Sequence, residues 1–242
     1  MATYKRYRKD DAVSYSLGIT LTFELLRFKT EYVQKVYVHS GMKQGETLDK
    51  LVLLCKEAGI EIVHTDKIFN VLSQKENCYV IGEFQKFTGT LSKEESHIVL
   101  VNPSNAGNMG TIMRSALGFG MNQMAIIRPA VDAFDPKVVR ASMGAIFSTD
   151  FVYFDSFEEY ASQFGNRELY PFMLDAKVSL HDVRPKGNFS LIFGNEATGL
   201  PTEFSSIGTS VIIPHSNQID SLNLPIAASI AMYEATKERF YQ

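Results

Sequence analysis

The sequence predicts an α/β protein with a mostly parallel sheet covered by helices on both faces, preceded by a smaller α/β unit. Short apolar runs alternate with amphipathic helical patterns along nearly the whole chain, which is typical of βαβ units. Runs such as I-V-L-V and M-A-I-I are apolar at every position, as expected for parallel strands buried on both sides. Residues 88–96 lose this periodicity and gain polar residues, which indicates a linker between two domains, 1–87 and 97–242.

The first domain is predicted to form its helices and strands between residues 14 and 87. Helical periodicity favours helices at 17–28, 47–58 and 67–72. Apolar, β-branched runs favour strands at 33–39, 61–64 and 79–87. Gly59 is expected to end the second helix, and Asp66 is the candidate N-cap of the third.

The second domain begins at His97 and continues the alternation of strands and helices. We expect strands at 97–101, 123–128, 151–154, 170–174, 190–194 and 210–214. We expect helices at 108–119, 135–142 and 156–164, a short helix after Pro201, and a long last helix over 222–240. Ser221 is the candidate N-cap of this last helix, and Pro225 falls in its first turn, where a missing N–H costs little.

The composition is that of a globular protein. A chain of 242 residues with 45% hydrophobic and 21% charged residues can bury a full core. No apolar run is long enough to span a bilayer, and the charged residues 1–11 do not resemble a secretory signal. Cys55 and Cys78 form no CxxC motif, and the five histidines are scattered. The sequence therefore predicts a cytoplasmic protein without a membrane segment or a metal site.

A net charge of −3 argues against nucleic-acid binding by the whole surface, so such binding requires a local patch. Residues 4–9 offer one, because Y-K-R-Y-R-K interleaves four cations with two tyrosines. Cations meet phosphates, and tyrosine rings stack on bases. A frayed, solvated N-terminus that makes no specific contact is the simpler interpretation of the same residues.

Residues 99–114, V-L-V-N-P-S-N-A-G-N-M-G-T-I-M-R, run from a strand through a polar loop into a helix. The loop is rich in Asn, Ser, Pro and Gly, which favour turns and helix caps. Arg114 lies one turn inside the helix, and the unpaired N–H groups at the helix start suit a phosphate or another anion. An ordinary strand–helix turn with a surface arginine remains the alternative interpretation.

Two more polar loops follow predicted strands, at the carboxyl ends where ligands of open α/β sheets bind. The loop G-N-E-A-T-G-L over 194–200 places Glu196 between two glycines, which permit close approach of backbone to a ligand. The loop P-H-S-N-Q-I-D-S-L-N over 214–223 holds Ser221 and Asn223. Turn formation and helix capping account for these residues as well, so spacing alone leaves both interpretations open.

The three loops together resemble the SpoU/TrmH-type RNA ribose 2′-O-methyltransferases, a family of the knotted SPOUT class. The first motif matches at Asn108, Gly110 and Arg114. The second and third motifs match at Gly194, Glu196, Gly199, Leu200, Ile213, Pro214, Ser221, Leu222 and Asn223. The resemblance covers residues 97–240, and residues 14–87 more loosely resemble the ribosomal-protein-like RNA-binding module that some members carry.

This resemblance implies a trefoil knot in the C-terminal domain, S-adenosylmethionine as cofactor and a homodimer. The residues it assigns to cofactor binding are Gly194, Gly199, Leu200, Ile213 and Leu222. The residues it assigns to catalysis are Arg114, Asn108, Glu196, Ser221 and Asn223. Because a guanidinium stays protonated in proteins, we expect Arg114 to grip the phosphate beside the target ribose and orient the 2′-hydroxyl.

The implied substrate is RNA, and the N-terminal module favours ribosomal over transfer RNA. A non-catalytic RNA-binding or assembly protein on the same fold is one alternative, but it would be expected to lack Arg114, Asn108 or Asn223, which are all present. A nicotinamide-dependent dehydrogenase is another. It requires G-x-G-x-x-G after the first strand, which Asn108-x-Gly110 does not supply.

Overall fold

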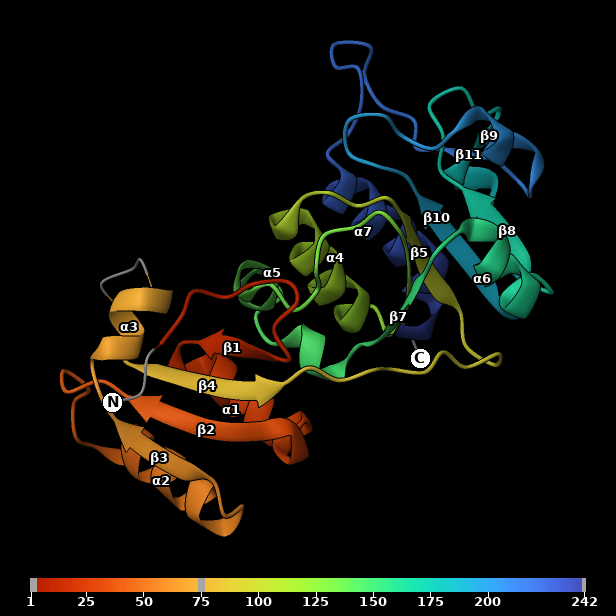
Figure 1. Cartoon of the computed structure of the whole chain (residues 1–242). Coiled ribbons are helices and arrows are strands. Elements are labelled where there is room, and N and C mark those ends of the chain that lie inside the picture. The colour runs from red at the N-terminus through yellow and green to blue at the C-terminus, as the bar shows by residue number, and fades with distance from the viewer. Residues whose placement is uncertain (1–3, 74–76, 241–242) are drawn as a thin grey trace. The chain divides into compact units, whose positions relative to one another are not determined.

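A computed structural model describes residues 4–73 and 77–240 of the chain (Figure 1). The chain forms two compact units. The first unit comprises Met1–Phe87 together with Asp132–Ser148, and the second comprises Thr88–Val131 together with Thr149–Gln242. The division at Phe87 coincides with the predicted end of the first domain. The structure differs from the prediction at 132–148, which sequence periodicity had assigned to the second domain.

The first unit is built on a four-stranded mixed sheet in the order β1-β4-β2-β3. Strand β4 is antiparallel to β1 and β2, and β3 is parallel to β2. The elements between residues 13 and 85 are β1 (Val13–Leu17), α1 (Ile19–Phe28), the 3-10 helix η1 (Thr30–Tyr32), β2 (Val33–Val38), α2 (Glu46–Glu57), β3 (Glu61–His64), α3 (Lys67–Leu72) and β4 (Val80–Gln85). The predicted helices and the strands β2, β3 and β4 are thereby confirmed, with ends that differ by one or two residues.

The segment 132–148 completes the core of the first unit. It holds helix α5 (Pro136–Ala141) and the 3-10 helix η2 (Ala145–Ser148). The ring of Phe84 on β4 lies 6.3 Å from the ring of Phe134 and 5.3 Å from that of Phe147. All three rings are buried, so this later piece of chain supplies apolar surface that the first 87 residues need.

Two details of the first unit differ from the sequence prediction. Strand β1 was not expected, because its inward-facing residues are Ser14 and Ser16, both fully buried. Ser14 Oγ donates to the carbonyl of Phe134, which satisfies the buried hydroxyl. Asp66 does not cap α3. Its carboxylate instead accepts the N–H and hydroxyl of Ser40, each at 2.8 Å.

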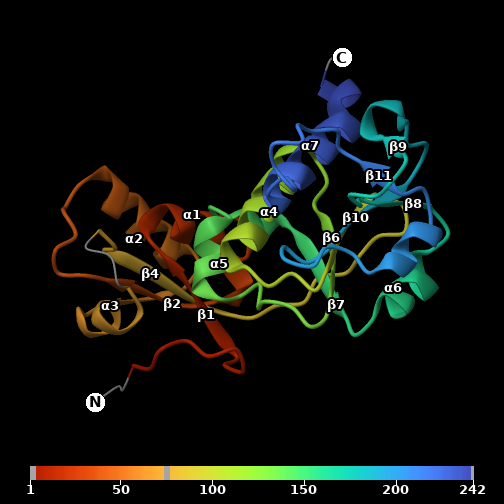
Figure 2. The ribbon, with the colours of Figure 1, turned by 90° about the horizontal axis from the view of Figure 1, so that it is seen from above.

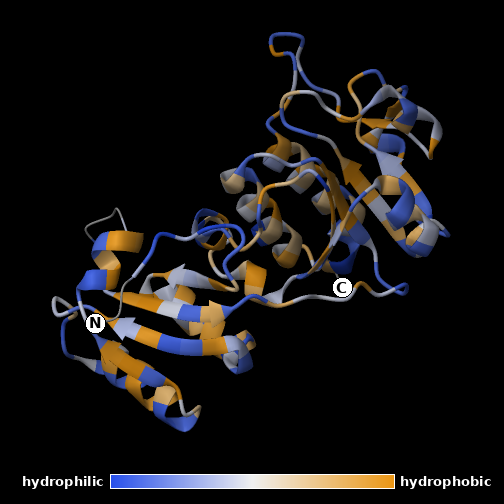
Figure 3. Ribbon diagram, viewed as in Figure 1, coloured by the Kyte–Doolittle hydropathy of each residue, from blue (hydrophilic) through white to orange (hydrophobic). Residues whose placement is uncertain are grey.

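The second unit contains a five-stranded sheet in the order β7-β6-β5-β10-β8, with every neighbouring pair parallel. Its strands are β5 (His97–Val101), β6 (Gln123–Ile127), β7 (Asp150–Phe154), β8 (Glu168–Pro171) and β10 (Phe189–Phe193). The sixth predicted strand is only β11 (Val211–Ile212), which pairs with β9 (Val178–Ser179) outside the main sheet. Figure 3 shows β5 and β10 as hydrophobic strands within this unit.

Helices cover both faces of this sheet, as predicted. On one face Val99 and Val101 pack with Tyr160 of α6 (Phe157–Phe164) and Phe204 of the 3-10 helix η4 (Thr202–Ser206). Side chains alternate along a strand, so Ile98 and Leu100 point to the other face. That face is covered by α4 (Ala106–Gly118) and α7 (Leu224–Thr236), which lie side by side in Figures 1 and 2 and are joined by a Ser229–Ser115 hydroxyl contact of 2.8 Å.

The last helix begins later than predicted. Helix α7 starts at Leu224 after Asn223, and the 3-10 helix η5 (Lys237–Phe240) follows it. Ser221 therefore lies outside the helix and is not its N-cap. The reason is Pro225, because proline is tolerated only in the first helical turn and so fixes the start of the helix close to itself.

The predicted linker 88–96 packs on the second unit. The N–H of Ser92 donates to Gln123 Oε1 at 2.9 Å, and the Ser92 carbonyl lies 2.8 Å from His97 Nε2. His97 Nδ1 lies 2.9 Å from the Tyr160 hydroxyl, which in turn lies 2.6 Å from Ser190 Oγ. Since the Ser92 carbonyl only accepts, His97 carries a proton on Nε2, and the neutral imidazole then accepts from Tyr160 on Nδ1.

We predict that this network makes the protein less stable in acid. Burial, reinforced by the Arg167 charge, lowers the pKa of His97 from 6.5 to about 4. The unfolded chain therefore binds a proton first as pH falls, and stability is lost from about pH 6.5 down to about pH 4. Urea unfolding of the wild type should lose about 2 kcal/mol more than His97→Gln between about pH 7 and pH 4.5. Equal losses in both proteins would contradict this, and exposed His64→Gln is the control.

Candidate active site

A cavity of about 230 Å³ lies in the second unit, where chain segments leave the carboxyl ends of β8 and β10. Three stretches form its wall: residues 172–174 after β8, residues 193–199 after β10, and residues 211–227 up to the first turns of α7. The lining residues are Phe172, Met173, Leu174, Phe193, Gly194, Asn195, Glu196, Ala197, Thr198, Gly199, Val211, Ile212, Ile213, His215, Ser221, Leu222, Leu224 and Ala227. The position is the one that parallel α/β sheets use for ligands.

Four of the five residues predicted to bind a cofactor line this cavity: Gly194, Gly199, Ile213 and Leu222. The fifth, Leu200, does not line it. Its side chain is 9% exposed and packs in the core cluster of the sheet face that α6 covers. Of the predicted catalytic residues, Glu196 and Ser221 line the cavity, whereas Asn108, Arg114 and Asn223 are not among its lining residues.

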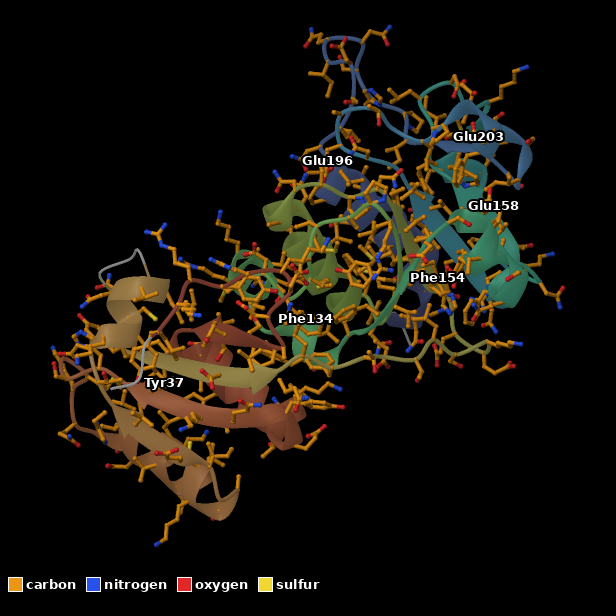
Figure 4. All side chains as sticks on the ribbon, viewed as in Figure 1. Tyr37, Phe134, Phe154, Glu158, Glu196 and Glu203 are labelled. Atoms are coloured by element: carbon orange, nitrogen blue, oxygen red, sulfur yellow. The ribbon has the colours of Figure 1, made fainter. Side chains whose placement is uncertain are left out.

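The carboxylate of Glu196 sits on the N-terminus of α4. Its Oε2 accepts the N–H of Ser104 at 3.1 Å and the Ser104 hydroxyl at 2.8 Å. Its Oε1 accepts the N–H of Asn105 at 3.1 Å and Nδ2 of Asn108 at 3.2 Å. Glu196 is labelled in Figure 4, where its loop lies beside the start of α4. The anion site predicted at this helix start is therefore filled by a side chain of the protein itself.

The environment of Glu196 keeps it ionised. Burial alone would raise the pKa of its carboxyl, but the hydrogen bonds from Ser104 and Asn108 outweigh burial and hold the pKa below 4.5. A lowered carboxyl pKa stabilises the folded state at neutral pH, and that stabilisation is lost as pH falls through the folded-state pKa. Glu196 therefore acts as a fixed negative charge that ties the 194–200 loop to the start of α4.

Asn195 ties the same two loops together, a role that the sequence did not indicate. Its Nδ2 donates to the carbonyl of Asn102 at 2.8 Å, and its Oδ1 accepts the N–H of Ala197 at 2.9 Å. Asn102 follows β5 in the left-handed region, with φ of 53°. The one feature of the sequence that could have pointed to Asn195 is its position between Gly194 and Glu196 in the second motif. The lining residues 172–174 were missed because they are not polar turn formers.

Gly194 and Gly199 shape the turn that floors the cavity. Asn195 and Gly199 exchange backbone hydrogen bonds of 3.2 and 2.9 Å, which closes a tight turn. A Cβ atom on Gly194 would lie 2.2 Å from the carbonyl carbon of Gly199, so no other residue fits there without moving the backbone. Gly199 has a φ of 69°, which favours glycine.

Arg114 stands apart from the cavity lining on an exposed face of α4. Within residues 4–73 and 77–240, no hydrogen bond or ion pair holds its guanidinium. Leu117, one turn further along α4, is 39% exposed and lies on the same side of the helix. Asn108 reaches the cavity wall only through Glu196, and Asn223 is the residue immediately before α7.

The cavity suits a ligand with an apolar or aromatic part and neutral polar groups. Its lining is mainly aliphatic, aromatic and backbone, and Glu196 and His215 are the titratable side chains among the described lining residues. In the described part of the chain, no group of His, Cys, Asp or Glu side chains is arranged to hold a metal ion. No described helix meets the length and hydropathy needed to cross a bilayer.

The fold and the position of the cavity define a parallel α/β protein that binds its ligand in loops at the carboxyl ends of the strands. The sequence model of the SpoU rRNA methylase family matches residues 95–233, more than half of the chain. The chain therefore belongs to the SpoU rRNA methylase family.

Individual relatives agree with this assignment. The chain is 30% identical over 150 residues to the 23S rRNA (uridine(2479)-2′-O)-methyltransferase of Streptomyces viridochromogenes, a match over 59% of this chain and 52% of that protein. The chain thus spans about half the length of that relative. The S-adenosylmethionine-bound rRNA methyltransferase of Sinorhizobium meliloti shares the fold, with a TM-score of 0.81, 21% identity and coverage of 94% of this chain and 88% of that one.

A third structure is described as giving insight into 2-OH methylation of C/U34 on tRNA. It matches with a TM-score of 0.56 and 27% identity, and it covers 62% of this chain and all of its own. The Sinorhizobium structure therefore has a counterpart for nearly the whole chain, whereas this third structure matches only a part.

We predict that Gly194→Ala destabilises the cavity loop. The added Cβ collides with backbone of Gly199 and Leu200, and relief of such overpacking typically costs about 1–3 kcal/mol. Urea unfolding should show this loss, and hydrogen exchange should show faster opening of residues 194–200. Gly118→Ala is the matched control, because its Cβ would meet no atom within 4 Å. Equal stability of the two variants would contradict the crowding described for Gly194.

Proposed function

We propose that this protein transfers a methyl group from S-adenosylmethionine to a ribose 2′-hydroxyl of ribosomal RNA. The observation that carries the proposal is the cavity itself, because two of the three motif loops that the family match includes form its wall. The remaining motif loop is joined to that wall by the carboxylate of Glu196. The cofactor supplies an activated methyl group, so the chain's own residues contribute binding, orientation and electrostatics.

The residues that would hold the cofactor are those that line the cavity. Backbone groups of Gly194 and Gly199 and the side chains of Ile213 and Leu222 offer neutral contacts for an adenosine moiety. Ser221 adds a hydroxyl at the cavity wall. Glu196 and Asn108 are positioning residues, because their polar groups are engaged with each other and with the start of α4. The Leu200 side chain supports the loop from the core.

Arg114 is the residue proposed to handle the RNA. Its side chain is exposed and presents a planar fork of donors that fits a phosphate bidentately. Gripping the phosphate beside the target ribose would orient the 2′-hydroxyl, whose proton leaves to phosphate or water. Asn223, exposed just before α7, is proposed to contact the ribose.

Ribosomal RNA is favoured over transfer RNA by the extent of the structural matches. The Sinorhizobium rRNA methyltransferase matches 94% of this chain, whereas the structure concerned with tRNA position 34 matches 62%. The additional matched length requires residues of the first unit. A unit that accompanies the rRNA enzyme fits the role of an RNA-binding module, as the resemblance of residues 14–87 to a ribosomal protein implies.

The knot implied by the resemblance is part of this proposal. It is supported by the return of the chain after β10 to the edge of β8. There the N–H of Thr209 donates to Leu169 O at 2.9 Å, and the N–H of Met173 donates to Val211 O at 3.0 Å. The second bond joins two stretches of the cavity wall, one that precedes β10 in the sequence and one that follows it.

The proposed function predicts that Arg114→Lys loses most methyl transfer while cofactor affinity is retained. A lysine keeps the charge but not the bidentate fork. Transfer of labelled methyl from S-adenosylmethionine to undermodified rRNA and tRNA should be measured beside calorimetric titration with S-adenosylmethionine and NAD. Arg27→Lys in α1 is the matched control. Normal turnover by the Arg114 variant would disprove its role, and a wild type that binds NAD but not S-adenosylmethionine would disprove the function.

We further propose that the chain works as a homodimer through the exposed face of α4 and α7. Ile226, Ile230 and Tyr233 of α7 are 52%, 38% and 44% exposed, and their spacing places them on one side of the helix. The rings of Tyr233 and Phe119, just past α4, lie 6.0 Å apart, so this face of α7 adjoins the end of the helix that carries Leu117 and Arg114. A second copy would cover the apolar face and bring a guanidinium to the interface.

We predict that Ile230→Glu separates this dimer, because a charge would be buried without a partner at the interface. Light scattering after size exclusion should give the mass of one chain for this variant and of two chains for the wild type. Leu53→Glu is the control, since Leu53 is an exposed leucine of α2, 54% accessible, in the other unit. A single-chain mass for the wild type would refute the dimer.

A further inference from the structure

Residues 4–9, which we call the N-terminal arm, are held against the first unit by their two tyrosines. The arm has neither helix nor strand. The Tyr4 ring meets the ring of Tyr37 edge-on at a centroid distance of 5.8 Å, and the Tyr7 hydroxyl donates to Asp132 Oδ2. Tyr37 is labelled on the sheet of the first unit in Figure 4. The tyrosines thus serve as anchors, and the solvated-terminus interpretation does not describe this segment.

Lys86 fixes the other end of the arm. Its Nζ donates to the Lys9 carbonyl at 2.6 Å and to Asp132 Oδ2 at 3.1 Å, and it lies 4.9 Å from the centroid of the Tyr7 ring. The side chains of Lys86 and Asp132 are only 18% and 12% exposed. A largely buried ion pair therefore holds Tyr7 and Lys9 together, and the backbone between them has a defined path.

Three cations of the arm are left for a ligand. Lys5, Arg6 and Arg8 are exposed, and no hydrogen bond or ion pair engages their side chains anywhere in residues 4–73 and 77–240. The nearby carboxylate of Asp11 accepts the backbone N–H of Arg8 at 2.7 Å, and exposed Asp10 follows the arm. Because the backbone is already fixed, a polyanion that binds these cations orders only their side chains.

The arm also determines the charge of the first unit. Residues 1–87 and 132–148 carry 15 Lys and Arg against 13 Asp and Glu, whereas the rest of the chain carries 9 against 14. The cation excess of the first unit is therefore smaller than the four cations of the arm. A local cationic patch on an otherwise acidic protein attracts polyanions to one place.

We propose that the N-terminal arm is a phosphate-binding element for the RNA backbone. Lys5, Arg6 and Arg8 contact phosphates, and Tyr4, Tyr7 and Lys86 hold the arm in the binding geometry. This inference rests on the proposed function, because RNA is the polyanion that the enzyme is proposed to modify. Contacts to phosphates fix register and add affinity without reading sequence.

The test compares two triple variants with equal charge change. Lys5→Gln/Arg6→Gln/Arg8→Gln removes the free cations of the arm. Lys43→Gln/Lys50→Gln/Lys56→Gln removes three exposed cations on and just before α2 in the same unit. Binding to a fluorescein-labelled 23S rRNA transcript is measured by anisotropy across a salt series, without cofactor. The arm variant should bind about tenfold more weakly with a salt slope smaller by about 2, as expected for three lost phosphate contacts, and the α2 variant should match the wild type.

Tyr7→Phe separates anchoring from charge. It keeps every cation but removes the hydroxyl that donates to Asp132. RNA affinity should fall by about twofold to fivefold while the salt slope stays at the wild-type value, because the number of phosphate contacts is unchanged. A slope reduced as far as in the triple variant would overturn the division between anchors and contacts.

Three outcomes would overturn the inference: equal weakening by both triple variants, no weakening by either, or arm-dependent binding to phosphatidylserine vesicles tighter than to RNA. Calorimetric titration of each variant with S-adenosylmethionine keeps this test separate from the proposed function. A wild type that binds RNA through the arm but ignores the cofactor would refute the methyltransferase and leave the arm supported. A wild type that binds the cofactor, together with an arm variant whose RNA affinity equals that of the wild type, would support the methyltransferase and refute the arm.

Discussion

The geometry of the site depends on one carboxylate at one helix start. Glu196 neutralises the N-terminal end of α4 through the N–H groups of Ser104 and Asn105, and so joins the loop after β5 to the loop after β10. Because the strands β5 and β10 are neighbours in the sheet, a single side chain can bridge the loops that follow them. Asn195 repeats the connection through the carbonyl of Asn102. Without these bonds, the cavity wall formed by residues 193–199 would have no fixed relation to α4.

Much of the fold could be predicted because its cause is local. Strands such as β5 and β6 are apolar throughout, and α2 has a clear inward stripe, so period and burial agree. Strand β1 could not be predicted, since its buried residues are serines satisfied by partners distant in sequence. The assignment of residues 132–148 to the first unit could not be predicted either. The periodicity of this segment indicates a buried helix but does not show which of the two cores the helix packs in.

The site shows the same division between local and distant information. Motif spacing located Gly194, Glu196 and Ile213, and the structure brings all three to one cavity. Spacing could not show that Glu196 occupies the helix start expected to bind a ligand, nor that Arg114 is not among the residues that line the cavity. The sequence around Asp66 and Ser221 is compatible with helix capping by each of them. In the structure the Asp66 carboxylate binds Ser40 instead, and Pro225 moves the start of α7 beyond Ser221.

The segment Asp132–Ser148 limits how the two units can be separated or transferred to another protein. Because Asp132–Ser148 belongs to the first unit, the chain passes between the units at 87/88, 131/132 and 148/149. A proteolytic cut at any one of these passages would still leave part of each unit covalently joined to the other unit at the two uncut passages. Grafting the first unit onto another enzyme would need two separate stretches of sequence, and a clone beginning at Thr88 would carry the buried side chains of α5 with nothing to bury them. The N-terminal part is therefore no detachable fusion module, although it comes first in the sequence.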